Sequence, residues 1–85
     1  MGLPQWSDLG MFLQTFMLLA TEAGLDTCAQ EAWAVHEAAV AEFVGAPDEQ
    51  RIFCGVALGH GDDQAPINAF TTGRLPLEAW ATFVR

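Results

Sequence analysis

The chain has 85 residues, of which 52% are hydrophobic, so it forms one small domain or part of a larger one and is too apolar for ordinary disorder. Eleven acidic residues against three arginines and no lysine give a formal net charge of −8 at pH 7. Because this charge repels phosphate-rich surfaces, we expect no binding to nucleic acid or to an anionic membrane surface.

A first helix is predicted from Leu9 to Ala23, after a lead-in that offers Ser7 and Asp8 as its cap. One apolar stripe of this helix consists of Leu9, Phe12, Leu13 and Phe16, and further apolar side chains on other sides are Met11, Met17 and Leu18. A helix that is apolar nearly all round must be covered on several sides. A chain this short has little else to cover it, so we expect a homo-oligomer, most simply a dimer.

The same stretch is a poor membrane segment or export signal. A bilayer-spanning helix needs about 20 predominantly apolar residues. A signal peptide begins with basic residues, and Met1 to Asp8 has none. We therefore expect a soluble, cytoplasmic protein.

A second, amphipathic helix is predicted from Gln30 to Val44, after a short connection at 25–28. Its apolar side carries Trp33, Val40, Phe43 and Val44, and its acidic side carries Glu31, Glu37 and Glu42. Gly24 and Gly45 follow the two predicted helices directly, as glycine commonly does at a helix end.

The clearest strand runs from Arg51 to Leu58, a nearly continuous apolar run typical of a central strand. Pro66 to Phe70 is predicted as a short extended piece, and Pro76 begins a last helix from Leu77 to Val84. Two extended pieces are fewer than the three strands that a stable sheet usually needs. The pattern therefore predicts a helix-dominated α+β fold that oligomerisation completes.

Four stretches in this order resemble the C-terminal half of the FMN-dependent nitroreductase family: LGMFLQTFMLLATEAGLDTC, QEAW, IFCGVALGHGDDQAPIN and GRLPLEAW. The resemblance covers Trp6 to Val84. It implies an α+β fold with two interlocked subunits, FMN at their interface, and hydride transfer from NAD(P)H to a nitroaromatic or quinone acceptor. It also implies that residues 1–85 form a single partial domain without the N-terminal half of the family fold.

The resemblance also implies which residues hold FMN. The segment that lies against the flavin ring matches Cys28, Ala29, Gln30, Glu31 and Ala32, with a backbone N–H near the Glu31/Ala32 pair facing the flavin N5. The family usually has Pro at the position of Ala29 and often Gly at that of Ala32. The hydride chemistry belongs to the cofactor, so no catalytic side chain is expected.

Arg74 matches the family's late arginine that pairs with the FMN phosphate, for which a guanidinium fork has suitable geometry. The alternative is a solvated arginine that closes a turn. Thr71 and Thr72 stand where family members often carry a second basic residue. Because phosphate affinity depends on several converging donors, we expect weak FMN binding by the isolated chain.

Other polar groups do not form a recognisable site. Cys28 and Cys54 are widely spaced and predict buried free thiols rather than a disulfide or a zinc site. His60, Asp62 and Asp63 lack the spacing of a zinc or calcium site and predict a polar loop, so no metal is expected.

Two hypotheses follow. In the first, the chain is a flavin-dependent oxidoreductase fragment whose site another chain or further sequence completes, and it is inactive alone. In the second, it is a truncated, non-catalytic homo-oligomeric module without bound flavin.

Overall fold

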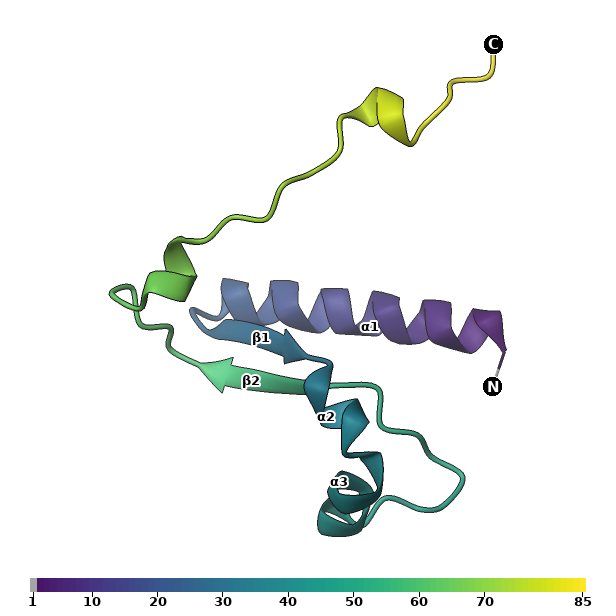
Figure 1. Cartoon of the computed structure of the whole chain (residues 1–85), viewed down its shortest axis with the longest axis vertical. Coiled ribbons are helices and arrows are strands. Elements are labelled where there is room, and N and C mark those ends of the chain that lie inside the picture. Colours follow the sequence, from purple (N-terminus) through teal and green to yellow (C-terminus); the bar gives the residue numbers. More distant parts are fainter. Residues whose placement is uncertain (1) are drawn as a thin grey trace.

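The computed structural model describes residues 2–85. It consists of a small antiparallel sheet flanked by helices and an extended C-terminal segment, residues 60–85 (Figure 1). The elements are α1 (Leu3–Glu22), β1 (Asp26–Gln30), α2 (Ala32–Val35), α3 (Glu37–Val44), β2 (Gly55–Gly59) and the 3₁₀ turns η1 (Pro66–Ala69) and η2 (Leu77–Ala79). This helix-rich arrangement confirms the predicted α+β class.

Helix α1 begins at Leu3, six residues before the predicted start. Pro4 lies in its first turn, where a missing N–H costs no helical hydrogen bond, and Gln5 Oε1 accepts the Gly2 N–H at 2.9 Å. The predicted cap at Ser7 and Asp8 therefore lies inside the helix and is wrong. At the other end, Gly24 has a φ of +81°, so the predicted glycine stop is correct.

Strand β1 is the main element that the sequence did not predict. It occupies the expected connection and the first residue of the expected second helix, and it pairs antiparallel with β2, with Cys28 opposite Ala57 and Gln30 opposite Gly55. Its sequence, DTCAQ, has neither an apolar run nor a clear alternation. The strand forms because β2, distant in sequence, supplies its hydrogen-bond partners, an effect that local propensity does not contain.

Strand β2 is shorter than predicted. It starts at Gly55, and residues 51–54 of the expected strand lie outside the sheet. The reason is the length of β1, which ends at Gln30 opposite Gly55 and leaves the preceding residues without a partner strand in the described part of the chain.

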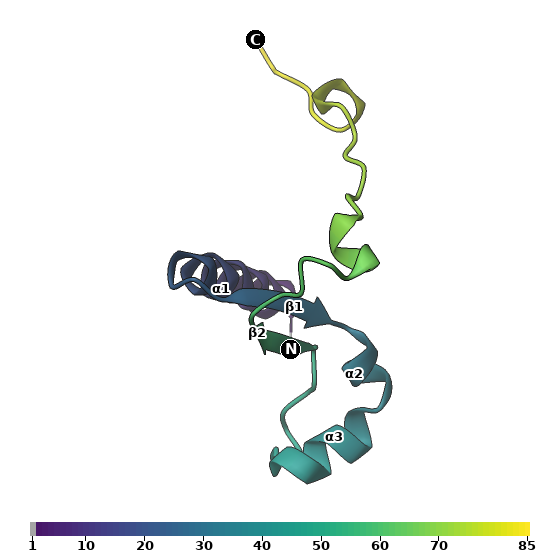
Figure 2. The same ribbon diagram turned by 90° about the vertical axis from the view of Figure 1, so that its left-hand side faces the viewer.

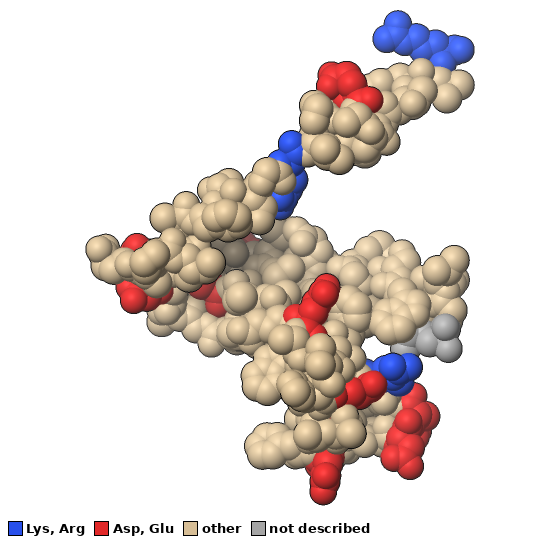
Figure 3. All heavy atoms as spheres, viewed as in Figure 1, with Lys and Arg blue, Asp and Glu red and all other residues tan. Residues whose placement is uncertain are grey.

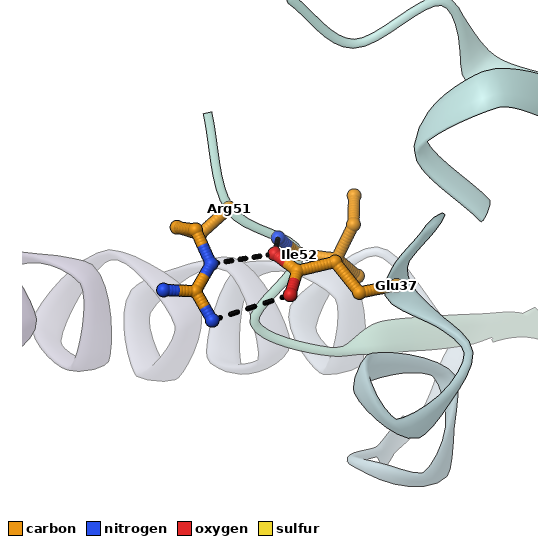
Figure 4. Close-up of polar contacts among 3 residues, drawn as sticks. All are labelled: Glu37, Arg51 and Ile52. Carbon is orange, nitrogen blue, oxygen red and sulfur yellow. Dashed lines mark hydrogen bonds and ion pairs between the residues drawn. The ribbon is translucent and has the colours of Figure 1, made fainter. Parts of the chain in front are cut away.

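The predicted helix from Gln30 to Val44 is interrupted at His36, whose φ of −107° and ψ of 37° separate α2 from α3. Glu37, the first residue of α3, accepts hydrogen bonds from Arg51 Nε at 2.7 Å, Arg51 Nη2 at 3.2 Å and the Ile52 N–H at 3.0 Å (Figure 4). These bonds attach the residues before β2 to α3 in place of a sheet ladder. Gly45 ends α3 with a φ of +72°, as predicted.

Beyond β2 the chain contains little regular structure. Pro66 to Phe70 includes the turn η1 rather than an extended piece, and the expected helix from Leu77 to Val84 is reduced to η2. Figures 1 and 2 show this segment leading away from the sheet in both views. A short helix is marginal unless it packs against a neighbour, which explains why η2 extends no further.

The single chain buries very little apolar surface. Ala20 is the one buried hydrophobic residue among those described, whereas Phe12 is 69% exposed and Phe43 is 93% exposed. The accessible surface is 7629 Å², against about 4,900 Å² for a compact protein of this mass. The radius of gyration is 16.7 Å, against about 12 Å for a compact domain of this length. The fold therefore needs cover that the chain does not provide by itself.

No helix within residues 2–85 combines the length and apolar character needed to cross a membrane.

Candidate functional site

The five residues expected at the flavin ring lie at the junction between β1 and α2. Cys28, Ala29 and Gln30 end the strand, Glu31 forms the turn, and Ala32 begins the short helix. All five are exposed. The structure thus presents a continuous, accessible stretch of backbone at this junction.

Glu31 offers an unpaired backbone donor at this stretch. Its carbonyl accepts the Ala34 N–H at 2.9 Å, which closes the turn. Its own N–H has no protein acceptor among the described residues. An exposed N–H without a partner can donate to a ligand atom with a lone pair, so the junction fits a ring nitrogen such as flavin N5.

Trp33 connects the junction to the neighbouring strand. Its indole Nε1 donates to Gln30 Oε1 at 2.9 Å. The same ring lies directly over Gly55, where a Cβ would come within 2.9 Å of Nε1. The sequence predicts Trp33 only as a packing residue on an apolar helix face, and no local pattern identifies its bond to Gln30.

The arginine expected at the phosphate lies in a different part of the chain. Arg74 is in the segment between η1 and η2, and its Nη1 donates to the Thr72 carbonyl, the Thr72 hydroxyl and the Gly73 carbonyl. These partners are its near neighbours in sequence. Arg74 lines none of the three described cavities, whereas Cys28 and Gln30 of the junction each line one.

Positive charge is sparse and separated. Arg51 is paired with Glu37, and the other two arginines, Arg74 and Arg85, come after η1 in the sequence. In Figure 3 the blue basic side chains lie apart from one another. Hydrogen bonds from Arg51 and from the Ile52 N–H hold the pKa of Glu37 below its ordinary value, and the Glu37 carboxylate raises the pKa of Arg51. Arg51 is therefore already paired with an acid. Of the other two arginines, Arg74 lies closer in sequence to β2 than Arg85 does.

Two cavities lie beside the junction. A groove of about 900 Å³ lies between the sheet and the two short helices and is mainly apolar, with Trp33, Phe43, Cys54 and Val56 among its lining residues. A smaller cavity of about 310 Å³ is lined by Cys28, His60 and Asn68, among others.

The polar loop after β2 is held by one carboxylate of β1 and one of its own. Asp26 Oδ2 accepts the Gly61 N–H at 2.7 Å, and Asp62 Oδ1 accepts the Gln64 N–H at 2.9 Å. These bonds agree with the predicted loop. Both cysteines are free, as expected, but Cys28 is exposed and Cys54 is only half-buried, so the expectation of two buried thiols is wrong. The position of Cys28 on a strand with an open edge and an uncovered face explains its exposure.

Comparison with known proteins identifies the family of the chain. The model of the nitroreductase family matches residues 4–60. The chain is 41% identical over 73 residues to a 4-nitrobenzoate reductase of Pseudomonas putida, a match covering 86% of this chain and 31% of the relative. It is 37% identical over 83 residues to a chloronitrobenzene nitroreductase of Comamonas testosteroni, covering 94% of this chain and 37% of the relative.

A solved structure gives the same answer for the fold. The crystal structure of the FMN and NADPH-dependent nitroreductase NfnB from sphigopyxis sp. strain HMH matches all of this chain with a TM-score of 0.94 and 44% identity. The match covers 38% of the NfnB chain. The present chain thus spans about a third of the length of the relatives it matches. Sequence, family model and fold agree, and the chain belongs to the nitroreductase family.

Proposed function

We propose that this chain forms part of an FMN-dependent nitroreductase, corresponding to the C-terminal half of the family fold, that transfers hydride from NAD(P)H to a nitroaromatic or quinone acceptor. The observation that carries the proposal is the exposed β1–α2 junction with its unpaired Glu31 N–H. It occurs in a chain all of which matches part of an FMN and NADPH-dependent nitroreductase. When bound, FMN supplies the hydride chemistry.

The residues of this chain bind and orient the cofactor. The backbone of Cys28–Ala32 would hold the flavin ring, and the Glu31 N–H would orient it by donating to a ring nitrogen. Arg74 would pair with the phosphate through its guanidinium fork. Its present hydrogen bonds to Thr72 and Gly73 are exposed and local, so a phosphate can replace them at little cost.

The rest of the site comes from a second chain or from further sequence. The chain exposes about 2,700 Å² more surface than a compact protein of its mass, and much of its exposed surface is apolar. Interfaces of permanent complexes bury areas of this order. We therefore propose a homo-oligomer, most simply a dimer.

A second candidate is a non-catalytic homo-oligomeric module. The observation that favours it is the charge distribution, since one of the three arginines is paired with Glu37 and the other two lie on the C-terminal segment. An anionic cofactor meets few available cations on a chain with a net charge of −8.

Titration with FMN separates the two candidates. The purified chain is titrated with FMN up to millimolar concentration while flavin absorbance and fluorescence are recorded, and NADPH oxidation is then followed with 4-nitrobenzoate as the acceptor. Saturable flavin binding supports the reductase, and acceptor-dependent NADPH oxidation is expected only where the oligomer completes the site. An oligomer that leaves the flavin signals unchanged throughout contradicts it and supports the non-catalytic module.

A further inference from the structure

The indole of Trp33 and the backbone of Gly55 enclose the strand end that the proposed function places at the flavin. Gln30 and Gly55 face each other across the β1–β2 ladder. The indole of Trp33 reaches back from α2, donates its Nε1–H to Gln30 Oε1 at 2.9 Å, and covers Gly55. One side chain thus contacts both strands at the last pair of the ladder.

Gly55 is required for this contact. A Cβ at this position would lie 2.9 Å from Trp33 Nε1 and 3.1 Å from Cγ, closer than side chains normally approach. The ring is therefore positioned from two directions, by a steric stop at Gly55 and by a hydrogen bond at Gln30. A hydrogen bond of this kind weakens steeply when its geometry is disturbed.

The turn that follows Gln30 depends on this anchor. Between Gln30 and Trp33 lie only Glu31 and Ala32, so fixing the two ends restricts the backbone between them. The Ala34 N–H then closes the turn on the Glu31 carbonyl at 2.9 Å. α2 has only four residues and is too short to be stable without such a contact.

We propose that Trp33 is a positioning residue, which holds the Gln30–Ala32 turn in place through its bond to Gln30 and its contact with Gly55. Trp33 thereby sets the direction of the Glu31 N–H toward the flavin ring, a step that rests on the proposed function. Trp33 does not itself react.

Amide hydrogen exchange of the purified chain tests the positioning role without any cofactor. Trp33→Phe removes the donor together with part of the ring that lies over Gly55, and Gln30→Met removes only the acceptor with nearly the same side-chain size. The reporter is the Ala34 amide, whose bond to Glu31 closes the turn. Trp80→Phe is the matched control, since Trp80 lies beyond η2 in the C-terminal segment, and the Ala23 amide at the end of α1 is the internal reference.

We expect Trp33→Phe and Gln30→Met each to accelerate exchange at Ala34 by about three- to tenfold, the usual effect of one side-chain hydrogen bond. The double variant should exchange no faster than the faster single variant, because both changes remove the same bond. Unchanged exchange at Ala34, an additive double variant, or no protection of Ala34 in the unaltered chain would overturn the proposal.

The midpoint potential of added FMN tests the link to the flavin, because a purely structural role would lower affinity without changing the potential. We expect Trp33→Phe to change this potential and Trp80→Phe to leave it unaltered. An unchanged potential in Trp33→Phe contradicts the orienting role. Failure of the unaltered chain to bind FMN instead overturns the proposed function, and exchange at Ala34 then decides the positioning role alone.

Discussion

Glu37 and Arg51 form a two-pronged ion pair across 14 positions of sequence, with Arg51 Nε 2.7 Å from Glu37 Oε1 and Nη2 3.2 Å from Oε2. The same carboxylate accepts the Ile52 N–H at 3.0 Å. α3 and the residues before β2 are thereby joined where the sheet ladder has ended. Glu37 is thus a structural acid rather than the solvated helix residue that its position in the sequence predicts.

This pair predicts a pH dependence. Hydrogen bonds lower the pKa of Glu37 from its ordinary value of 4.5, so its contribution to stability is complete above that pH and is lost as the pH falls through the lowered value. Glu37→Gln should therefore lower the urea midpoint of unfolding at pH 7, and the difference from the unaltered chain should vanish in acid. Glu42→Gln, on the same helix, is the control; an equal loss in both variants would contradict the assignment.

Two glycines predict opposite effects of the same substitution. Gly45 has a φ of +72° at the end of α3, where a Cβ is strained, so Gly45→Ala should destabilise the fold by about 1 kcal/mol. Gly10 lies inside α1, and a Cβ added there would meet no atom within 4 Å, so Gly10→Ala should stabilise the fold by about 0.5–1 kcal/mol. Chemical unfolding of both variants measures the two shifts, and a shared sign would contradict the helix-end assignment.

The proposed role of Arg74 predicts that FMN affinity depends on its guanidinium group. If it pairs with the FMN phosphate, Arg74→Ala should weaken FMN binding roughly 10- to 100-fold, the usual effect of losing charge-assisted hydrogen bonds. The FMN affinity of Arg74→Lys should lie between those of the unaltered chain and Arg74→Ala, because an ammonium keeps the positive charge but not the guanidinium fork. Fluorescence titration measures all three, with Arg85→Ala as the control. Equal losses in Arg74→Ala and Arg85→Ala would assign the effect to net charge alone.

The apolar surface of α1 predicts how the chain associates. Phe12 is 69% exposed on this helix, and a charge placed there would be desolvated in any interface that covers it. Phe12→Glu should weaken self-association about tenfold or more. Gln14→Glu adds a charge to the same helix at a position already polar and should change it little. Light scattering over a dilution series compares the two, and identical association would exclude Phe12 from the interface.

The sequence predicted those parts of the fold that local chemistry determines. Gly24 and Gly45 end their helices as expected, because glycine, which has no Cβ, tolerates the positive φ of a helix end whatever its neighbours are. Strand β1 was missed because its pairing depends on a strand 25 or more positions later, and the tail of the chain was overpredicted as helix because η2 lacks a packed neighbour. Tertiary contacts, not propensity, decided both cases.

The sequence also predicted only part of the candidate site. The family motif at Cys28–Ala32 falls on the β1–α2 junction, a boundary that the sequence did not predict, and its place at the flavin ring stays a prediction. The sequence did not predict the bond between Trp33 and Gln30. Nor did it predict that Gly55 lies beneath the indole, because this contact depends on the antiparallel register of the two strands. Placement of Arg74 at a phosphate stays a prediction.

Sedimentation velocity in the presence of FMN, recorded both for protein and at about 450 nm, where oxidised flavin absorbs, tests whether the chain forms an oligomer that binds flavin. We expect the chain to sediment as an oligomer and flavin absorbance to move with it, in proportion to the FMN added until the sites are filled. Flavin that stays behind while the chain sediments as a monomer at every concentration would contradict this expectation.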